Sequence, residues 1–187
     1  MTARRTQQRP PDHPAAWRTA LFFLIAGGIV WLGTVDARAM LGNDLLKFGT
    51  LEFEDYLSPE AEREIFRLIS IASIIIIVSY AVVLISAGIF LATSPFRLKE
   101  HGWLMISAIL LYIFVPVEVF SMTIDVRMIY AEFFTTADNS VFRQLFIARL
   151  GALAGAPVVA LLCYYTIILL AVFQPLRRPP AGAHHEA

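Results

Sequence analysis

Four long stretches with almost no charged side chains constrain this sequence more than any other feature. Residues 19–35, 68–96 and 150–176 contain no Asp, Glu, Lys or Arg, and residues 102–124 contain Glu118 alone. A hydrocarbon core about 30 Å thick is crossed by about 20 residues of α-helix, because each residue adds about 1.5 Å. Inside lipid the backbone has to satisfy its own hydrogen bonds, which an apolar segment of this length does as a helix. The sequence therefore predicts four transmembrane helices.

The composition agrees with this interpretation and excludes several classes of protein. Of the 187 residues, 58% are hydrophobic and 16% are charged, and the mean hydropathy is +0.67. Soluble domains are typically about half apolar and about a quarter charged. Fifteen Lys and Arg balance fifteen Asp and Glu, so no basic excess points to nucleic acid. Cys163 is the single cysteine, which excludes an intrachain disulfide, a CxxC redox pair and a cysteine zinc site.

The predicted fold class is an all-α integral membrane protein, a bundle of four transmembrane helices. We expect a basic cytoplasmic tail (1–16), a membrane domain (17–175) and a disordered cytoplasmic tail (176–187). Within the membrane domain the spans are expected at about 18–35, 68–93, 103–123 and 150–174, joined by outer loops 36–67 and 125–149.

Signals at the helix ends indicate that the last three helices extend beyond the outer membrane face. Ser58-Pro59-Glu60 is typical of a helix start, because Ser caps the first turn and Pro suits the first helical position. The next breaker is Ser94-Pro95, which predicts a helix of some 35 residues, or roughly 50 Å. We expect the third helix to continue to about Phe134 with a kink at Pro116. The fourth is expected from near Val141 to just before Pro175.

The orientation follows from the basic residues that flank the spans. The N-terminal segment, the connection from Arg97 to Lys99 and the pair Arg177-Arg178 hold eight of the fifteen Lys and Arg in short segments on one side. The positive-inside rule then places both termini in the cytoplasm. Ala37-Arg38-Ala39 fits a signal-peptide cleavage site, but we expect the first segment to be a membrane anchor. The expected location is the plasma membrane (the inner membrane of a bacterium).

Glu118 is the outstanding candidate for function, because an ionisable side chain inside a transmembrane helix is costly. Asp125 and Glu132 follow at seven-residue steps, so the three carboxylates share one helix face if the helix continues. We expect Arg149 to pair with Glu118 as the first choice and Arg67 as the second. Three interpretations stay open: an ion-pair seam within the bundle, which we favour, a proton or cation path, and a contact with another subunit.

Two patches of small residues indicate close packing between helices. Gly151 and Gly155 form a GxxxG pattern, and small residues four apart allow two helices to approach closely. We expect this pattern to serve packing within the chain ahead of dimerisation. The run Ala26-Gly27-Gly28 offers a comparable patch in the first helix.

Motifs of catalysis and metal binding are missing from the sequence. It contains no P-loop, GxSxG or HExxH pattern. The four histidines lie in the tails or at a membrane boundary, where they cannot form the facing pair that ligates a haem. We therefore expect no enzyme activity, no cofactor and no metal site.

These observations favour a non-catalytic accessory or scaffolding subunit of a larger membrane protein complex, respiratory or transport complexes being examples. Its expected partners are the lipid bilayer and other membrane protein subunits, and nucleic acid is not among them. The alternative is a small proton- or cation-coupled transporter or channel component that uses Glu118. A third hypothesis, a quinone- or lipid-handling membrane enzyme, rests on Tyr112, Tyr164 and Tyr165 alone. The predicted topology is similar to that of small subunits of transporters and of respiratory complexes. A likeness in topology alone does not assign a role to any residue of this chain.

Overall fold

The computed structural model describes residues 14–47, 49–96, 98–135 and 138–176, so most of the two expected tails lies outside the described residues. Its helices are α1 (Pro14–Asn43), α2 (Pro59–Thr93), α3 (Gly102–Ile113), α4 (Val115–Phe134), α5 (Asn139–Gly151), the 3-10 turn η1 (Ala152–Gly155) and α6 (Ala156–Phe173). Four segments of the described chain are long and apolar enough to span a membrane, namely Ala15–Asn43, Pro59–Thr93, Gly102–Phe134 and Ala156–Phe173. The predicted all-α multi-pass membrane bundle is confirmed.

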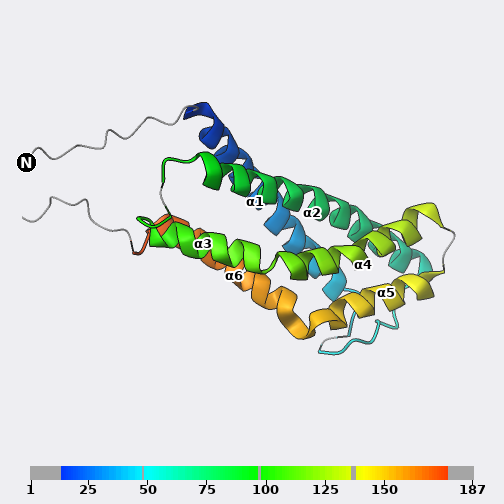
Figure 1. Ribbon diagram of the computed structural model, residues 1–187. Helices are drawn as coiled ribbons and strands as arrows, with labels where there is room; N and C mark the ends of the chain where they lie inside the picture. The colour runs from blue at the N-terminus through cyan, green and yellow to red at the C-terminus, as the bar shows by residue number, and fades with distance from the viewer. Residues whose placement is uncertain (1–13, 48, 97, 136–137, 177–187) are drawn as a thin grey trace, which may run out of the picture.

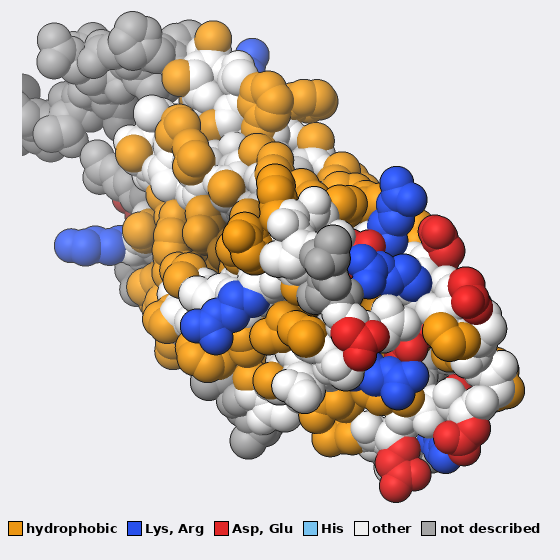
Figure 2. Space-filling model, turned by 90° about the vertical axis from the view of Figure 1, so that its right-hand side faces the viewer, with side chains coloured by type: hydrophobic (Ala, Val, Ile, Leu, Met, Phe, Trp, Pro, Cys, Tyr) orange, Lys and Arg blue, Asp and Glu red, His pale blue; other side chains and the backbone are white. Residues whose placement is uncertain are grey.

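The helices form an elongated bundle in which the start of α1 and the end of α6 lie at the same end (Figure 1). α1 packs along α2, α3 packs along α6, and α4 packs against α2 and α5 with fewer contacts to α6 and α3. The end of α4 and the start of α5 lie at the opposite end (Figure 1). On the face shown in Figure 2, charged side chains gather at that opposite end, whereas hydrophobic side chains cover most of the rest of this face. This division is the one that a bundle partly embedded in lipid requires, because lipid solvates apolar side chains and water solvates charges.

The predicted start of the second helix is confirmed at Ser58. The Ser58 hydroxyl accepts a hydrogen bond from the backbone N–H of Ala61 at 3.2 Å, and Pro59 occupies the first turn. The helix ends at Thr93, before Ser94-Pro95. With 35 residues it is about 50 Å long, which exceeds the ~30 Å of a hydrocarbon core. One end of α2 therefore has to extend out of the membrane.

The third span is kinked where the sequence predicts it. α3 ends at Ile113 and α4 begins at Val115, with Phe114 between them at φ −92° and ψ 0°. Pro116 has no backbone N–H and its ring crowds the carbonyl of Tyr112, so the regular hydrogen-bond pattern cannot pass through this point. The helix resumes at once, because the Glu118 N–H donates to the Phe114 carbonyl at 3.0 Å.

The last part of the chain differs from the single helix that we expected from Val141 to Pro175. α5 ends at Gly151, and η1 leads to Gly155, whose φ of +87° lies in the left-handed region. A glycine adopts this conformation without steric cost. Pro157 follows in the first turn of α6, where its missing N–H is tolerated. α5 and α6 are therefore separate helices, joined by a tight turn.

The expected outer loop at 36–67 is shorter in the structure, because α1 continues to Asn43 and α2 begins at Pro59. The connection folds back on itself. A β-bridge pairs Leu46 with Phe53, and the Lys47 N–H donates to the Glu52 carbonyl at 2.8 Å. Phe53 packs against Phe66 and Phe146 and so covers the charged end of the bundle.

The core is arranged as successive layers along the bundle. The layer under the 44–58 connection consists of Leu45, Phe66, Ile69, Met128, Phe142 and Phe146. The middle layer consists of Trp31, Ile76, Tyr80, Val83, Ala87, Leu111, Ala160 and Tyr164. The layer nearest the described chain ends consists of Ala20, Phe90 and Leu104. The polar site described next lies where the first two layers meet.

Candidate functional site

A buried carboxylate joins three helices between the first two core layers. Asp125 of α4 is 1% exposed, and both of its oxygens accept hydrogen bonds from arginines. Arg38 of α1 donates through Nη1 to Oδ2 at 2.8 Å, and Arg149 of α5 donates through Nε to Oδ1 at 2.6 Å. Arg38 also donates to the Ser73 hydroxyl of α2 at 3.1 Å. The network therefore connects α1, α2, α4 and α5.

The helices place these groups through their ordinary periodicity. The buried face of α4 carries Ser121, Asp125, Met128 and Ala131 at steps of three or four residues, as expected for one side of a helix. Arg149 occupies the last turn of α5, where a cation is favoured by the negative end of the helix dipole. Ser73 also donates to the Ile69 carbonyl at 2.9 Å, which fixes its oxygen as an acceptor for Arg38.

A cavity of about 320 Å³ adjoins this network and is lined by residues of α1, α2, α4, α5 and α6. Its polar lining comprises Arg38, Asn43, Arg149, Glu118, Tyr164 and Trp31. Glu118 is half-buried, lies near the Tyr164 hydroxyl and makes no ion pair within the described part of the chain. Its carboxylate therefore differs from that of Asp125, because it is available to the cavity.

The aromatic residues of the cavity carry buried polar atoms without a hydrogen-bond partner. Trp31 Nε1 and the hydroxyls of Tyr164 and Tyr80 are all of this kind. Their rings pack together, with centroid distances of 4.6 Å between Trp31 and Tyr164 and 4.8 Å between Trp31 and Tyr80. A buried donor left without an acceptor costs about 1–3 kcal/mol, so these atoms need an explanation beyond packing.

A second ion-pair cluster lies at the charged end of the bundle and was not predicted. Glu62 of α2 is 2% exposed and accepts hydrogen bonds from Arg143 of α5, from Nε at 2.5 Å and from Nη2 at 2.8 Å. Asn139 also donates to Glu62, at 3.1 Å. The hydrogen bond to Glu62 raises the pKa of Arg143 above its ordinary value, so this cation stays charged at any physiological pH. The cluster binds α5 to α2.

The predicted site residues are distributed over several environments. Asp125 and Arg149 are brought together, whereas Arg149 and Glu118 line the same cavity without an ion pair between them. Glu132 pairs with Arg63 of α2 at 3.4 Å. Arg67 is exposed and makes no ion pair among the described residues. Arg38 was missed as a partner, because the first span was expected to end at residue 35.

The two glycines of the GxxxG pattern lie apart from any close helix contact. Gly151 ends α5 and Gly155 precedes α6, both are exposed, and an added Cβ would meet nothing within 4 Å at either position. Gly27 of α1 is the close-packed one, since an added Cβ would lie 3.2 Å from Val82 and 3.3 Å from Val83. The neighbouring Gly28 has open space.

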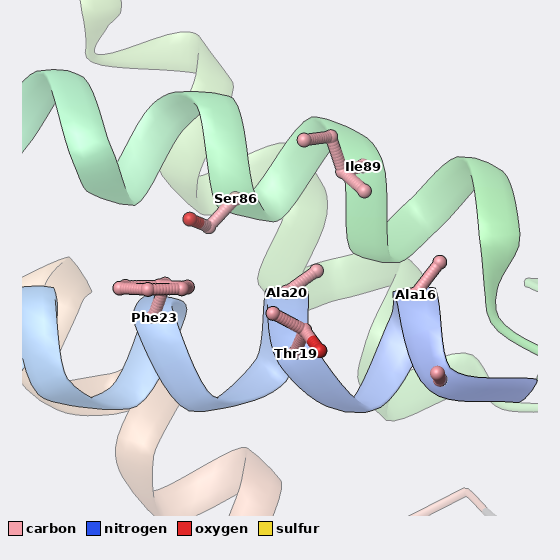
Figure 3. Close-up of a pocket in the computed structure, with 7 residues that line it drawn as sticks. Ala16, Thr19, Ala20, Phe23, Ser86 and Ile89 are labelled. Atoms are coloured by element: carbon pink, nitrogen blue, oxygen red, sulfur yellow. The ribbon is translucent and has the colours of Figure 1, made fainter.

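A second hollow, of about 420 Å³, lies between α1 and α2 near the described start of the chain. Figure 3 shows Ser86 and Ile89 of α2 facing Thr19, Ala20 and Phe23 of α1 across it. It has no charged side chain, so it offers packing surface and little chemistry.

The three tyrosines of the enzyme hypothesis do not form one group. Tyr164 lines the cavity, Tyr165 donates to Asp36 of α1, and Tyr112 of α3 is 39% exposed. No cluster of three or more His, Cys, Asp and Glu side chains suited to a metal ion occurs among the described residues.

Comparisons with protein families, with curated proteins and with solved structures give no match. The chain is therefore classified by its fold and its site. It is a multi-pass α-helical membrane protein with a buried arginine–carboxylate network beside a cavity between its helices.

Proposed function

We propose that this chain is a non-catalytic accessory or scaffolding subunit of a larger membrane protein complex. The observation that carries the proposal is the outward surface of α6. Only 11% of its apolar window is buried within the chain, against 44% for α2. Val158, Leu162 and Val172 are more than half exposed. Apolar helices of this kind associate in membranes by close packing with other helices.

A photo-crosslinking amino acid placed on α6 tests this proposal in the native membrane. At Leu162, which is 62% exposed, we expect a crosslink to one partner of fixed mass. At Leu111, which is 9% exposed, we expect none, so this position is the matched control.

Purification in a mild detergent provides the independent measurement. We expect a complex in which the partner is present in a fixed ratio to the 20.9 kDa chain. A lone, monodisperse chain with an activity of its own would rule the subunit role out.

The second candidate function is a proton- or cation-coupled transporter or channel component centred on Glu118. One observation favours it: the Glu118 carboxylate, which belongs to a candidate membrane-spanning segment, lines a cavity and has no ion-pair partner among the described residues. Carboxylates in such positions commonly mark proton and ion pathways.

Flux measurements in reconstituted vesicles separate this candidate from the first. Glu118→Gln should abolish flux, whereas Glu64→Gln, at an exposed position of α2, should leave it unchanged. Equal flux in the parent protein and the Glu118→Gln variant would eliminate the transport role.

For the location we propose the plasma membrane with both termini in the cytoplasm. The support is the basic bias of the flanking segments together with the shared end at which α1 starts and α6 ends (Figure 1).

A further inference from the structure

We propose that the cavity beside Asp125 binds the anionic head group of an amphipathic molecule, a carboxylate or phosphate carried on an apolar chain. The inference does not depend on the subunit role or on ion transport. It rests on the kind of polar group that lines the cavity, on the groups left without partners, and on the apolar surroundings.

The cavity presents hydrogen-bond donors in excess of the acceptors available to them. A guanidinium has five N–H donors, and in Arg149 one of them, on Nε, has an acceptor among the described residues. Arg38 uses Nη1 for Asp125 and Ser73. Both side chains line the cavity, so their remaining donors can serve a ligand that supplies oxygen acceptors.

One further donor in the lining has no partner. Trp31 is 3% exposed and its indole N–H is without a hydrogen bond, whereas the Tyr164 hydroxyl already has the Glu118 carboxylate nearby. An indole N–H can only donate. A bound carboxylate or phosphate would provide the acceptor that Trp31 lacks, which explains why a donor is kept at this position.

The backbone adds a partial positive charge to the cavity, at the N-terminus of α6. Gly155, Pro157 and Val158 at the start of α6 line the cavity, and no side chain caps this helix N-terminus. The free N–H groups and the helix dipole at such an end favour an anion. The backbone therefore agrees with the arginines and with Trp31 on the charge of the ligand.

Apart from Asn43, the other side chains of the lining are apolar, and they indicate that the ligand also has an apolar part. Val35, Ile69, Met128 and Leu161 are among these apolar side chains. A volume of about 320 Å³ is at the small end of ligand sites, so it holds a head group and the first part of a chain. α1 and α6 do not pack along one another, and their ring contact is Trp31 with Tyr164. The remaining chain can lie between these two helices.

Glu118 opposes an anion and so provides a sensitive test. The two arginines and the carboxylates of Asp125 and Glu118 sum to zero formal charge when all four are ionised. Replacing Glu118 by Gln removes the one negative group of the lining that is not neutralised by an ion pair. The variant should therefore bind an anionic ligand more tightly than the parent protein.

The experiment is a titration of the full chain in a non-ionic detergent, with bound ligand measured by native mass spectrometry. The probes are oleate, lysophosphatidic acid, oleyl alcohol, oleylamine and inorganic phosphate. We expect oleate and lysophosphatidic acid to bind at least tenfold more tightly than the neutral alcohol and the cationic amine. Equal binding of all the oleyl compounds, or preference for the amine, overturns the proposal. If inorganic phosphate displaces oleate at equal concentration, the site binds a soluble anion. That result overturns the proposal of an amphipathic ligand.

Conservative variants show whether the binding occurs in this cavity. Trp31→Phe should weaken oleate binding about tenfold, because it removes one hydrogen bond to a charged group. Trp103→Phe is the matched control, since Trp103 Nε1 is also buried and unpartnered but lies outside the cavity.

The Glu118→Gln variant keeps the proposal testable if an aromatic variant fails to fold. Tighter oleate binding by Glu118→Gln supports the proposal, whereas unchanged or weaker binding contradicts it. Oleate affinity that is unchanged in Trp31→Phe also contradicts it.

Discussion

Asp125 lies in an apolar bundle with both of its oxygens engaged by arginines from different helices. Removing a charge from water is costly, and the mutual attraction of ions repays this cost only when geometry and hydrogen bonding are good. Here the arginines come from two different helices, α1 and α5, and Ser73 accepts a hydrogen bond from Arg38. The Asp125 carboxylate is therefore stabilised by its hydrogen bonds to the two arginines, because an ionised carboxylate alone does not favour an apolar site.

This arrangement predicts a strong, non-additive effect of mutation. Asp125→Asn leaves two arginines without their counter-ion, so it should destabilise the bundle by about 3–5 kcal/mol. Arg38→Gln should also destabilise it, because half of the carboxylate's bonding is lost. The double variant should lose less than the sum of the two. The free energy of unfolding in detergent measures all three, and strict additivity would show that Arg38 and Asp125 do not interact.

The residues also show what sequence alone could provide. Asp125 and Arg149 were candidates, because charges in or next to apolar runs are conspicuous. The partner Arg38 lies 87 residues from Asp125, and no local pattern links two positions so far apart. Glu62 follows shortly after the helix-start signal Ser58-Pro59-Glu60, and that local signal does not indicate its partner Arg143. Pairing is a property of the packed bundle, so it appears only once the helices are placed.

At the scale of the helices, some of the boundaries could be predicted from the sequence and one could not. The start of α2 at Ser58-Pro59 and the kink near Pro116 follow from local chemistry, and the structure has both. The break between α5 and α6 was missed, because a GxxxG pattern is normally interpreted as a helix contact. At Gly155 the glycine instead provides a left-handed turn.

A matched pair of substitutions tests this account of the turn. Gly155→Ala should destabilise the protein by roughly 1–2 kcal/mol, because an L-residue is strained at the positive φ of this position. Gly151→Ala should be neutral or slightly stabilising, since Gly151 lies within α5 without a positive φ and Ala has a higher helix propensity than Gly. Both sites have open space for a Cβ, so a difference in melting temperature between the two variants reports the backbone strain at Gly155. Equal effects would mean that the turn does not need Gly155.

At the scale of the whole molecule, charged and apolar surfaces lie at different positions along the bundle (Figure 2). The charged end carries the 44–58 connection and the α4–α5 turn, and the other end carries the start of α1 and the end of α6 (Figure 1). A bundle with this division has one defined axis across the membrane. Its direction along that axis is set by the basic residues near the spans.

Cysteine accessibility tests that direction. In a Cys163→Ala background, a cysteine at the exposed Ser140 of the α4–α5 end should react with an impermeant thiol reagent in intact cells. A cysteine at Lys99, at the other end, should react only after the membrane is permeabilised. The opposite pattern would reverse the orientation and leave the four spans intact.

The separation between Arg38 and Asp125 has a consequence for the order in which the chain is assembled. A ribosome adds about 5–20 residues per second, so the 87 residues between them take on the order of ten seconds. During this interval α1 carries a cation with no counter-ion from α4, and its long side chain has to reach toward the lipid head groups. α1 can settle at its final depth only after α4 and α5 have been synthesised. The helix that is made first is therefore among the last to reach its final position.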